Sequence, residues 1–133
     1  MRELALARFW FAGGVALCLI VLVALLVPQD TFTTPASLGD KAQHFIAFGG
    51  IAGWFSGVFE RRYVWIVAVS IAGFGIVTEY LQWVLTDDRH GDIGDLLADL
   101  AGILAAVGAA RLGLDQWSAW IERRFGLEYR RTR

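Results

Sequence analysis

The chain has 133 residues, of which 56% are hydrophobic and only 19% are charged, and its mean hydropathy is +0.51. A small soluble domain must cover a large surface with polar groups, so this composition excludes an ordinary soluble domain and indicates a membrane protein. The net charge of −1 offers no field for a nucleic acid, and a single cysteine, Cys18, can form neither an intrachain disulfide nor a cysteine zinc site.

The first predicted element is an apolar helix over residues 9–28. Residues 9–27 carry no charge, and this run is long enough to cross a hydrocarbon core of about 30 Å. A signal peptide has a shorter apolar region, of about 7–15 residues, that ends at a small-residue cleavage site. Here Pro28, Gln29 and Asp30 follow the run instead, so we expect a retained membrane helix.

Three further apolar stretches predict helices over residues 43–59, 63–86 and 92–113. A charged break at residues 60–62 separates the first two, and Glu79 alone interrupts the second. The first and third are borderline by themselves, and buried helices of a soluble core are the alternative for them. The simplest interpretation is an all-α polytopic membrane protein with four transmembrane helices in a domain over residues 1–113.

Lysine and arginine are distributed unevenly between the two ends of such a bundle. If both termini lie in the cytoplasm, ten basic residues are inside and only Lys41 and Arg89 are outside. Basic residues concentrate on the cytoplasmic side of membrane proteins. The distribution therefore predicts a multi-pass protein with cytoplasmic N- and C-termini.

Small residues recur every four positions on two of the predicted helices, and such ridges let helix backbones approach closely. The ridges consist of Gly49, Gly53 and Gly57 in the second helix and of Ala98, Gly102 and Ala106 in the fourth. We expect these two helices to cross closely, although glycine and alanine are also generally abundant in membrane helices. Membrane lipids are the expected partners, and the ridges are compatible with a homo-oligomer.

The C-terminal segment, residues 114–133, has a different pattern. Leu114, Trp117, Ile121 and Phe125 fall on one helical face, and the charged residues lie largely elsewhere. Tryptophan and basic residues anchor helices at membrane surfaces. We therefore predict a C-terminal amphipathic interfacial helix on the cytoplasmic side, with a plain cytoplasmic helix as the alternative.

Polar residues gather at the predicted outer ends of helices two, three and four. In chain order they are Asp40, Lys41, His44, Glu79, Gln82, Arg89, Asp92, Asp95 and Asp99. A charged side chain that faces lipid costs about 3 kcal/mol or more, so we expect these side chains to turn inward and to line a pocket that opens outward. The alternative is a polar plug that only sets the register of the helices.

The pocket residues have different predicted roles. Glu79 and His44 are the candidate acid/base residues, since a carboxylate about 9 Å below the helix end needs a partner or a proton. The candidate substrate-binding residues are Asp40, Lys41, Gln82 and Arg89, the two basic ones for a phosphate or carboxylate. The candidate metal ligands are Asp92, Asp95 and Asp99, spaced i, i+3, i+7, whose oxygen atoms suit Mg²⁺ or Ca²⁺.

Three segments, in this order, resemble the motifs of VanZ-like membrane proteins. They read DKAQHFIAF at residues 40–48, GIVTEYLQ at 75–82 and RHGDIGDLLADLAG at 89–102. The resemblance covers about residues 9–110 and implies an integral protein of the bacterial cell envelope, located in the cytoplasmic (inner) membrane. The namesake is associated with low-level resistance to the glycopeptide teicoplanin. The family commonly has asparagine where this chain has Asp99, which adds a carboxylate at the deepest point of the acidic stripe.

Three functions remain open at this point, and so does the question whether the protein is an enzyme. The first is an enzyme or binding site for an envelope lipid or lipid-linked intermediate. The second is a non-enzymatic binding or interaction protein that alters the access of an antibiotic. The third is transport of a proton or small ion, for which four short helices are few without an oligomer.

Overall fold

The computed structural model describes residues 1–27, 39–85 and 93–127, and these residues form helices and turns without a β-strand. The long helices are α1 (Ala7–Leu26), α2 (Asp40–Val58), α3 (Val64–Leu85) and α4 (Ile93–Arg111), followed by the short α5 (Trp117–Arg124). Single 3₁₀ turns, Arg61–Tyr63 and Leu114–Gln116, precede α3 and α5. The prediction of an all-α chain is therefore confirmed.

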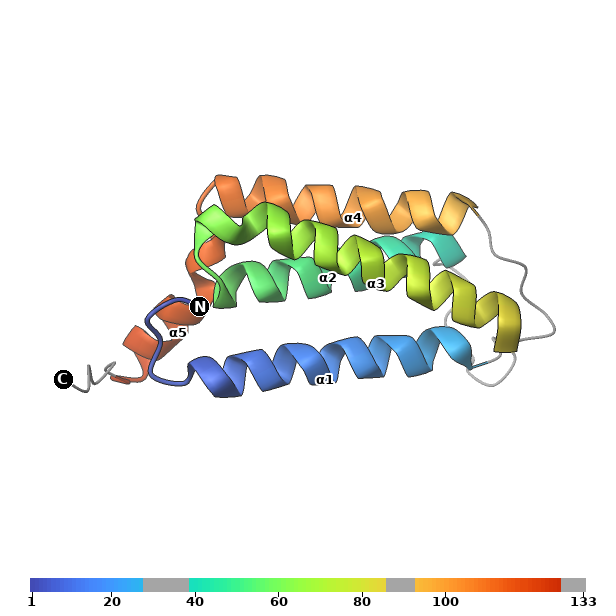
Figure 1. Ribbon diagram of the computed structural model, residues 1–133. Coiled ribbons are helices and arrows are strands. Elements are labelled where there is room, and N and C mark those ends of the chain that lie inside the picture. The colour runs from blue at the N-terminus through green and yellow to red at the C-terminus, as the bar shows by residue number, and fades with distance from the viewer. Residues whose placement is uncertain (28–38, 86–92, 128–133) are drawn as a thin grey trace.

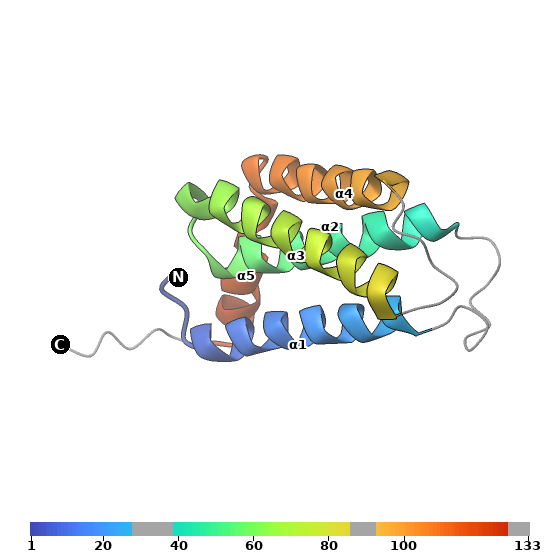
Figure 2. The same ribbon diagram turned by 45° about the vertical axis from the view of Figure 1, so that its right-hand side comes forward.

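The four long helices lie side by side with roughly aligned axes, and α5 lies at one end of the bundle (Figures 1 and 2). The N-terminus lies at this same end, which we call the tail end. The other end, which we call the site end, carries the start of α2, the end of α3 and the start of α4 (Figure 1). Segments that are far apart in the sequence are thus brought together at the site end.

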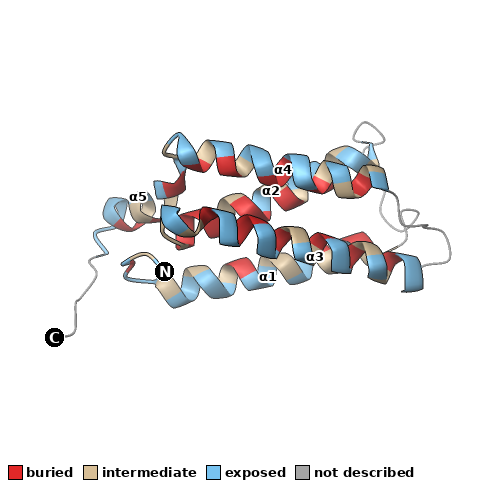
Figure 3. Cartoon of the chain, turned by 45° about the horizontal axis from the view of Figure 1, so that its top comes forward, coloured by how far each residue is buried: buried red, intermediate tan, exposed pale blue. Residues whose placement is uncertain are grey.

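Three segments are long and apolar enough to cross a membrane, namely Ala7–Leu26, Arg61–Leu85 and Ile93–Arg111. Helix α2 has a similar length but is not among them, because its first turns are polar. Exposed and buried positions alternate along each helix (Figure 3). Many of the exposed positions carry large apolar side chains; Val69, for example, is 72% exposed. Exposed apolar surface of this kind marks contact with lipid or another protein, and the three segments indicate a membrane protein.

Local sequence explains where two of the helices end. Val27, after the end of α1, has an extended backbone, and the next residue is Pro28, which disfavours a helical conformation in the residue before it. After α4, Gly113 has φ +103°, a left-handed conformation that glycine adopts without steric cost. The chain turns there and enters the segment that leads to α5.

Helices α2 and α4 make the most extensive helix contact of the bundle. A Cβ atom at Gly102 would collide with the carbonyl oxygen of Phe45 and would lie 3.0 Å from the backbone nitrogen of Gly49. The predicted close crossing is therefore confirmed. The predicted ridge on α2 is only partly used, because a Cβ atom at Gly53 would meet no described atom within 4 Å and Gly57 packs against the Trp117 indole rather than against α4.

A buried carboxylate joins three segments at the tail end. Asp115 accepts a hydrogen bond of 2.7 Å from Nη2 of Arg61 and a second hydrogen bond from the guanidinium of Arg2. The Nε atom of Arg2 in turn donates to the carbonyl oxygen of Phe59 at 2.9 Å. The N-terminal residues, the connection between α2 and α3, and the start of the C-terminal segment are thereby held together.

A second acid ties α5 to the start of α1. The carboxylate of Glu122 accepts hydrogen bonds from the backbone N–H groups of Ala5 (2.7 Å) and Leu6 (2.9 Å) and from the indole N–H of Trp10 (2.9 Å). Backbone N–H groups at the start of a helix lack partners within the helix, and a negative charge is favourable there. A residue more than one hundred positions away in sequence therefore holds the two residues that precede α1 and the first turn of the helix through Trp10.

The stability of the tail end should depend on pH through Asp115. Burial by itself raises the pKa of this carboxyl group, but the hydrogen bonds and charges of Arg61 and Arg2 outweigh burial, and the pKa lies below its ordinary value of 3.8. The ionised form therefore favours folding above about pH 4, and this contribution is lost as the pH falls through the lowered pKa. We expect thermal melting in detergent to place Asp115→Asn below the unmodified protein at pH 7, with the gap narrowing below pH 4. A gap that stays constant down to pH 3 would contradict this assignment.

Candidate functional site

The site end gathers polar side chains from three helices. Asp40 and His44 lie on the first turns of α2, Glu79 lies near the end of α3, and Asp95 and Asp99 lie on the first turns of α4. Because α2 begins at Asp40, the residues Asp40 and His44 lie one turn apart on the same helix face. The predicted convergence of these three helices in one polar cluster is confirmed for the residues that the structure describes.

A fully buried pair forms the centre of this cluster. The Nδ1 atom of His44 lies 2.9 Å from Oδ1 of Asp99, and both side chains are inaccessible to solvent. An ionised carboxylate can only accept hydrogen bonds, so with Asp99 ionised the imidazole carries its hydrogen on Nδ1. The His44 ring also stacks on the ring of Phe48, with a centroid distance of 6.3 Å and an interplanar angle of 4°. The imidazole is thus held in position by a hydrogen bond and a stacking contact.

Two residues of α3, Gly75 and Glu79, lie against this pair. A Cβ atom at Gly75 would lie 3.0 Å from Oδ2 of Asp99 and 3.3 Å from the Phe48 ring, so glycine lets both side chains pack closely against α3. One turn further on, Oε1 of Glu79 lies 3.8 Å from Nδ1 of His44. This separation is an electrostatic contact rather than a hydrogen bond. Glu79 and Asp99 therefore surround the same edge of the imidazole.

Two buried polar atoms of the pair have no hydrogen-bond partner among the described residues. They are Nε2 of His44 and Oδ2 of Asp99. Buried polar atoms in native structures are nearly always hydrogen-bonded, and an exception calls for an explanation such as a catalytic role or a bound ion or water. With Nδ1 held by Asp99, Nε2 presents a lone pair to whatever occupies the site.

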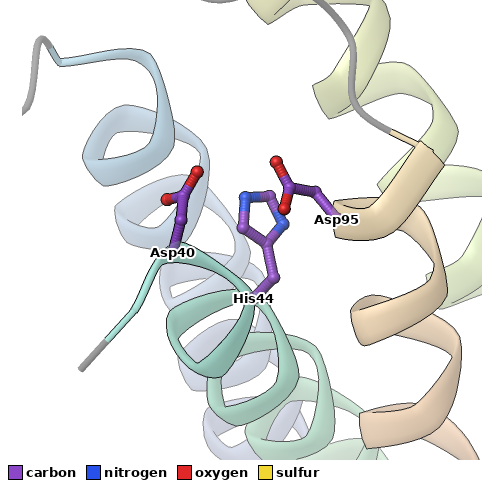
Figure 4. A group of neighbouring side chains, drawn as sticks. All are labelled: Asp40, His44 and Asp95. Carbon is purple, nitrogen blue, oxygen red and sulfur yellow. The ribbon is translucent and has the colours of Figure 1, made fainter.

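The mouth of the site contains two more acids and one lysine. Figure 4 shows the His44 ring between the carboxylates of Asp40 and Asp95, which come from α2 and α4. One ligand atom from each of these three side chains lies within 4.8 Å of the others. Nζ of Lys41 lies 3.3 Å from Oδ1 of Asp95, and the lysine side chain is 59% exposed whereas that of Asp95 is 11% exposed. The site therefore opens toward Lys41 and is closed on the side of Asp99.

The structure gives three of the other predicted site residues their own contacts. Gln82 was predicted to bind substrate, but its Nε2 donates at 2.9 Å to the carbonyl oxygen of Leu25, and it joins α3 to the end of α1. Among the described residues, Asp95 groups with Asp40 and His44, while Asp99 groups with His44 and Glu79. Asp92, the third predicted metal ligand, and Arg89, which was predicted to bind substrate, lie outside the described residues.

Two residues that support the site were not predicted from the sequence. Phe48 supplies the stacking surface and Gly75 supplies the space for Asp99. A phenylalanine or glycine on an apolar helix carries no signal by itself. The spacing of His44 and Phe48, one helix turn apart, is the only local hint that the two rings stack.

No protein-family model, curated protein or solved structure matches this chain. Functional assignment therefore depends on the geometry of the site and on the three sequence motifs. The segments that carry those motifs contribute His44, Glu79, Asp95 and Asp99, which lie together at the site end.

Proposed function

We propose that the chain is a VanZ-like integral protein of the bacterial cytoplasmic membrane, with four transmembrane helices and both termini in the cytoplasm. The central position of α2 supports it as the fourth span, because it contacts α1, α3 and α4 and fully buries Phe48, Ile51 and Val58. Polar residues in a membrane helix are tolerated where they face the interior of a bundle. The ten-to-two distribution of basic residues supports a position of the site end at the outer surface.

In this orientation α5 lies at the cytoplasmic membrane surface, as an interfacial helix. Its buried side contains Ser118 and Glu122, which contact the bundle. Trp117 also faces the protein, with its ring centroid 5.2 Å from that of Trp10. The side chains that remain for the headgroup region are those of Leu114, Trp120 and Phe125, which are 69%, 61% and 76% exposed.

At the outer surface, we propose that the polar pocket binds and processes an envelope lipid or lipid-linked intermediate. The observation that carries this proposal is the buried His44–Asp99 pair, in which Nε2 of the imidazole has no described partner. A histidine whose Nδ1–H is held by a carboxylate can act through Nε2 as a general base toward a hydroxyl group or water. Glu79, beside the same ring, stabilises the imidazolium that forms.

Lys41 gives this pocket a feature suited to lipid headgroups. Its ammonium group lies at the mouth of the site, 3.3 Å from Oδ1 of Asp95. The lysine side chain is 59% exposed, and ion pairs near the protein surface are weak, of about 1 kcal/mol, so the lysine can exchange Asp95 for a phosphate. The phosphate of a lipid headgroup would then lie next to the imidazole.

The test is the variant His44→Gln in protein reconstituted into nanodiscs with a bacterial lipid extract. We expect processing of the bound lipid, followed by mass spectrometry of recovered lipids, to fall about 100-fold or more, because the base is lost. Teicoplanin resistance of cells that express the variant should fall as well. Glu60→Gln is the matched control, since Glu60 lies at the tail end and pairs with exposed Arg62. Unchanged lipid processing in a folded His44→Gln variant would refute the proposal.

A second candidate function is a non-enzymatic binding protein that alters the access of an antibiotic. It is favoured by a groove of about 530 Å³ along α2 and α4, whose lining includes Gly49, Gly53, Trp54, Ala105, Ala109 and Trp117. The same resistance assay distinguishes the two candidates with Gly53→Leu, which fills the groove at a position with open space. Resistance that is lost in Gly53→Leu but retained in His44→Gln would favour this function over the first.

A further inference from the structure

Acidic side chains gather around the imidazole of His44 at the site end. Among the described residues, the carboxylates of Asp40, Glu79, Asp95 and Asp99 lie close to this ring, and Lys41 pairs with Asp95. Carboxylate oxygens together with an imidazole nitrogen are ligand types that divalent transition metals take in proteins. The cluster therefore has the donor atoms for a positively charged metal ion.

The direction of the imidazole indicates where that charge would lie. Asp99 holds Nδ1 of His44, and the solvent-inaccessible ring leaves Nε2 without a described partner. Histidines that bind metal ions commonly donate their other ring N–H to a carboxylate, which orients the ring and raises its basicity. Asp99 holds His44 in this way, and the ring lies between Asp40 and Asp95 (Figure 4).

We infer that Asp40, His44 through Nε2, and Asp95 bind a divalent transition-metal ion, Zn²⁺ or Mn²⁺, with Asp99 as the residue that positions His44. This inference rests on the proposed function, because it concerns the same pocket. Three protein ligands leave open coordination positions, as in catalytic zinc sites, and a phosphate or water can occupy them. The ligand atoms lie within 4.8 Å of one another, and a zinc ion with ligands at about 2.1 Å requires them to move closer.

The ligand types decide against the Mg²⁺ or Ca²⁺ that the acidic stripe alone suggested. Those ions prefer oxygen ligands, whereas an imidazole nitrogen with two carboxylates suits Zn²⁺ or Mn²⁺. The deeper group of His44, Glu79 and Asp99 is the less suitable set. A metal ion there would have to displace the 2.9 Å hydrogen bond between His44 and Asp99 and would leave Nε2 still buried without a partner.

Lys41 offers a test in which one variant should strengthen metal binding while the aspartate variants weaken it. Its ammonium group lies 3.3 Å from Oδ1 of Asp95, an atom that the metal ion would use. A metal ion must therefore displace or repel the lysine. Removal of this charge in Lys41→Met should tighten metal binding by about fivefold, the effect of losing an ion pair of about 1 kcal/mol near the surface. If the cluster were only a polar plug that sets helix register, Lys41→Met would not bind a metal ion more tightly.

The experiment is calorimetric titration of metal-stripped, full-length protein in detergent with Zn²⁺ and, separately, with Mn²⁺. We expect one ion per chain, and binding weakened at least about 10-fold in Asp40→Asn and Asp95→Asn through the loss of a ligand charge. Asp40 lies at the partly exposed start of α2, so Asp40→Asn should fold even if a variant at buried His44 does not. Glu60→Gln is the control and should bind like the unmodified protein.

The outcomes separate this inference from the proposed function. Absence of saturable binding of either ion, weaker binding in Lys41→Met, or equal affinities in Asp40→Asn and Glu60→Gln would each overturn the metal site. If lipid processing then still requires His44, the proposed function stands without a metal ion. If the ion binds as expected but His44→Gln leaves lipid processing unchanged, the proposed function fails and the metal site stands as structural.

Discussion

Replacement of Gly102 by valine is expected to destabilise the bundle by about 3 kcal/mol or more. The Cβ atom would collide with the carbonyl oxygen of Phe45 and would lie 3.0 Å from the nitrogen of Gly49, and both atoms belong to the backbone of α2. A side chain can rotate away from such a clash, but a helix backbone cannot, so α2 and α4 must separate. The measurement is equilibrium unfolding in mixed detergent micelles, together with the elution profile of the purified variant.

Gly108→Ala is the matched control for this prediction. Gly108 lies on the same helix, and a Cβ atom there would meet no described atom within 4 Å. Alanine is a better helix former than glycine by about 1 kcal/mol, so this variant should be neutral or slightly more stable. Similar losses of stability in both variants would mean that the contact between α2 and α4 does not set the stability of the bundle.

The crossing of α2 and α4 also has a consequence for the site. His44 lies one residue from Phe45 on α2, and Asp99 lies three residues from Gly102 on α4. This close backbone contact is therefore adjacent to the central pair of the site. Gly102→Ala introduces the same Cβ contact with less bulk than valine, so it should lower both stability and lipid binding, by less than Gly102→Val.

Substitution of Asp99 should have the second large effect, and its size should depend on what replaces it. Asp99→Leu removes the acceptor for Nδ1 of His44 and leaves a buried imidazole without either partner, which should cost about 3 kcal/mol and abolish lipid processing. Asp99→Asn keeps an oxygen atom as acceptor and removes only the charge. This variant should therefore fold, with lipid processing reduced because the imidazolium is less stabilised.

Unfolding midpoints in detergent and lipid processing, measured on the same preparations, check this order. The expected ranking for both quantities is the unmodified protein, then Asp99→Asn, then Asp99→Leu. Equal stability of the asparagine and leucine variants would show that the hydrogen bond between His44 and Asp99 contributes little. Full activity of the asparagine variant would show that the extra carboxylate, where the resembling family commonly has asparagine, is not needed for catalysis.

The number and kind of the long helices could be predicted from the sequence because the signals are local. Three signals depend on neighbouring residues alone: the apolar runs, the proline that follows α1 and the glycine that follows α4. The gathering of acids at one end was also predictable. Consecutive antiparallel helices place the start of α2, the end of α3 and the start of α4 at the same end of a bundle.

The tail end was predicted less well, because its key contacts join residues far apart in sequence. Of the apolar face predicted for the C-terminal segment, Leu114 and Phe125 are exposed, but Trp117 packs against Trp10. Asp115 and Glu122 are buried by partners from the N-terminal residues, which the sequence did not indicate. A buried acid cannot be distinguished from an exposed one until its cationic or N–H partners are known.

The sequence by itself determined the all-α class, the apolar segments and the set of polar residues that converge. Only the tertiary structure decided which of these residues pair. Asp95 and Asp99 lie one turn apart on α4, yet one reaches Lys41 at the mouth and the other holds His44 in the interior. Gln82 lies one turn from Glu79 but bonds to Leu25 of α1. The physical reason is that pairing depends on the rotation of each helix about its axis and on the close crossing at Gly49 and Gly102, which residue spacing along one helix does not specify.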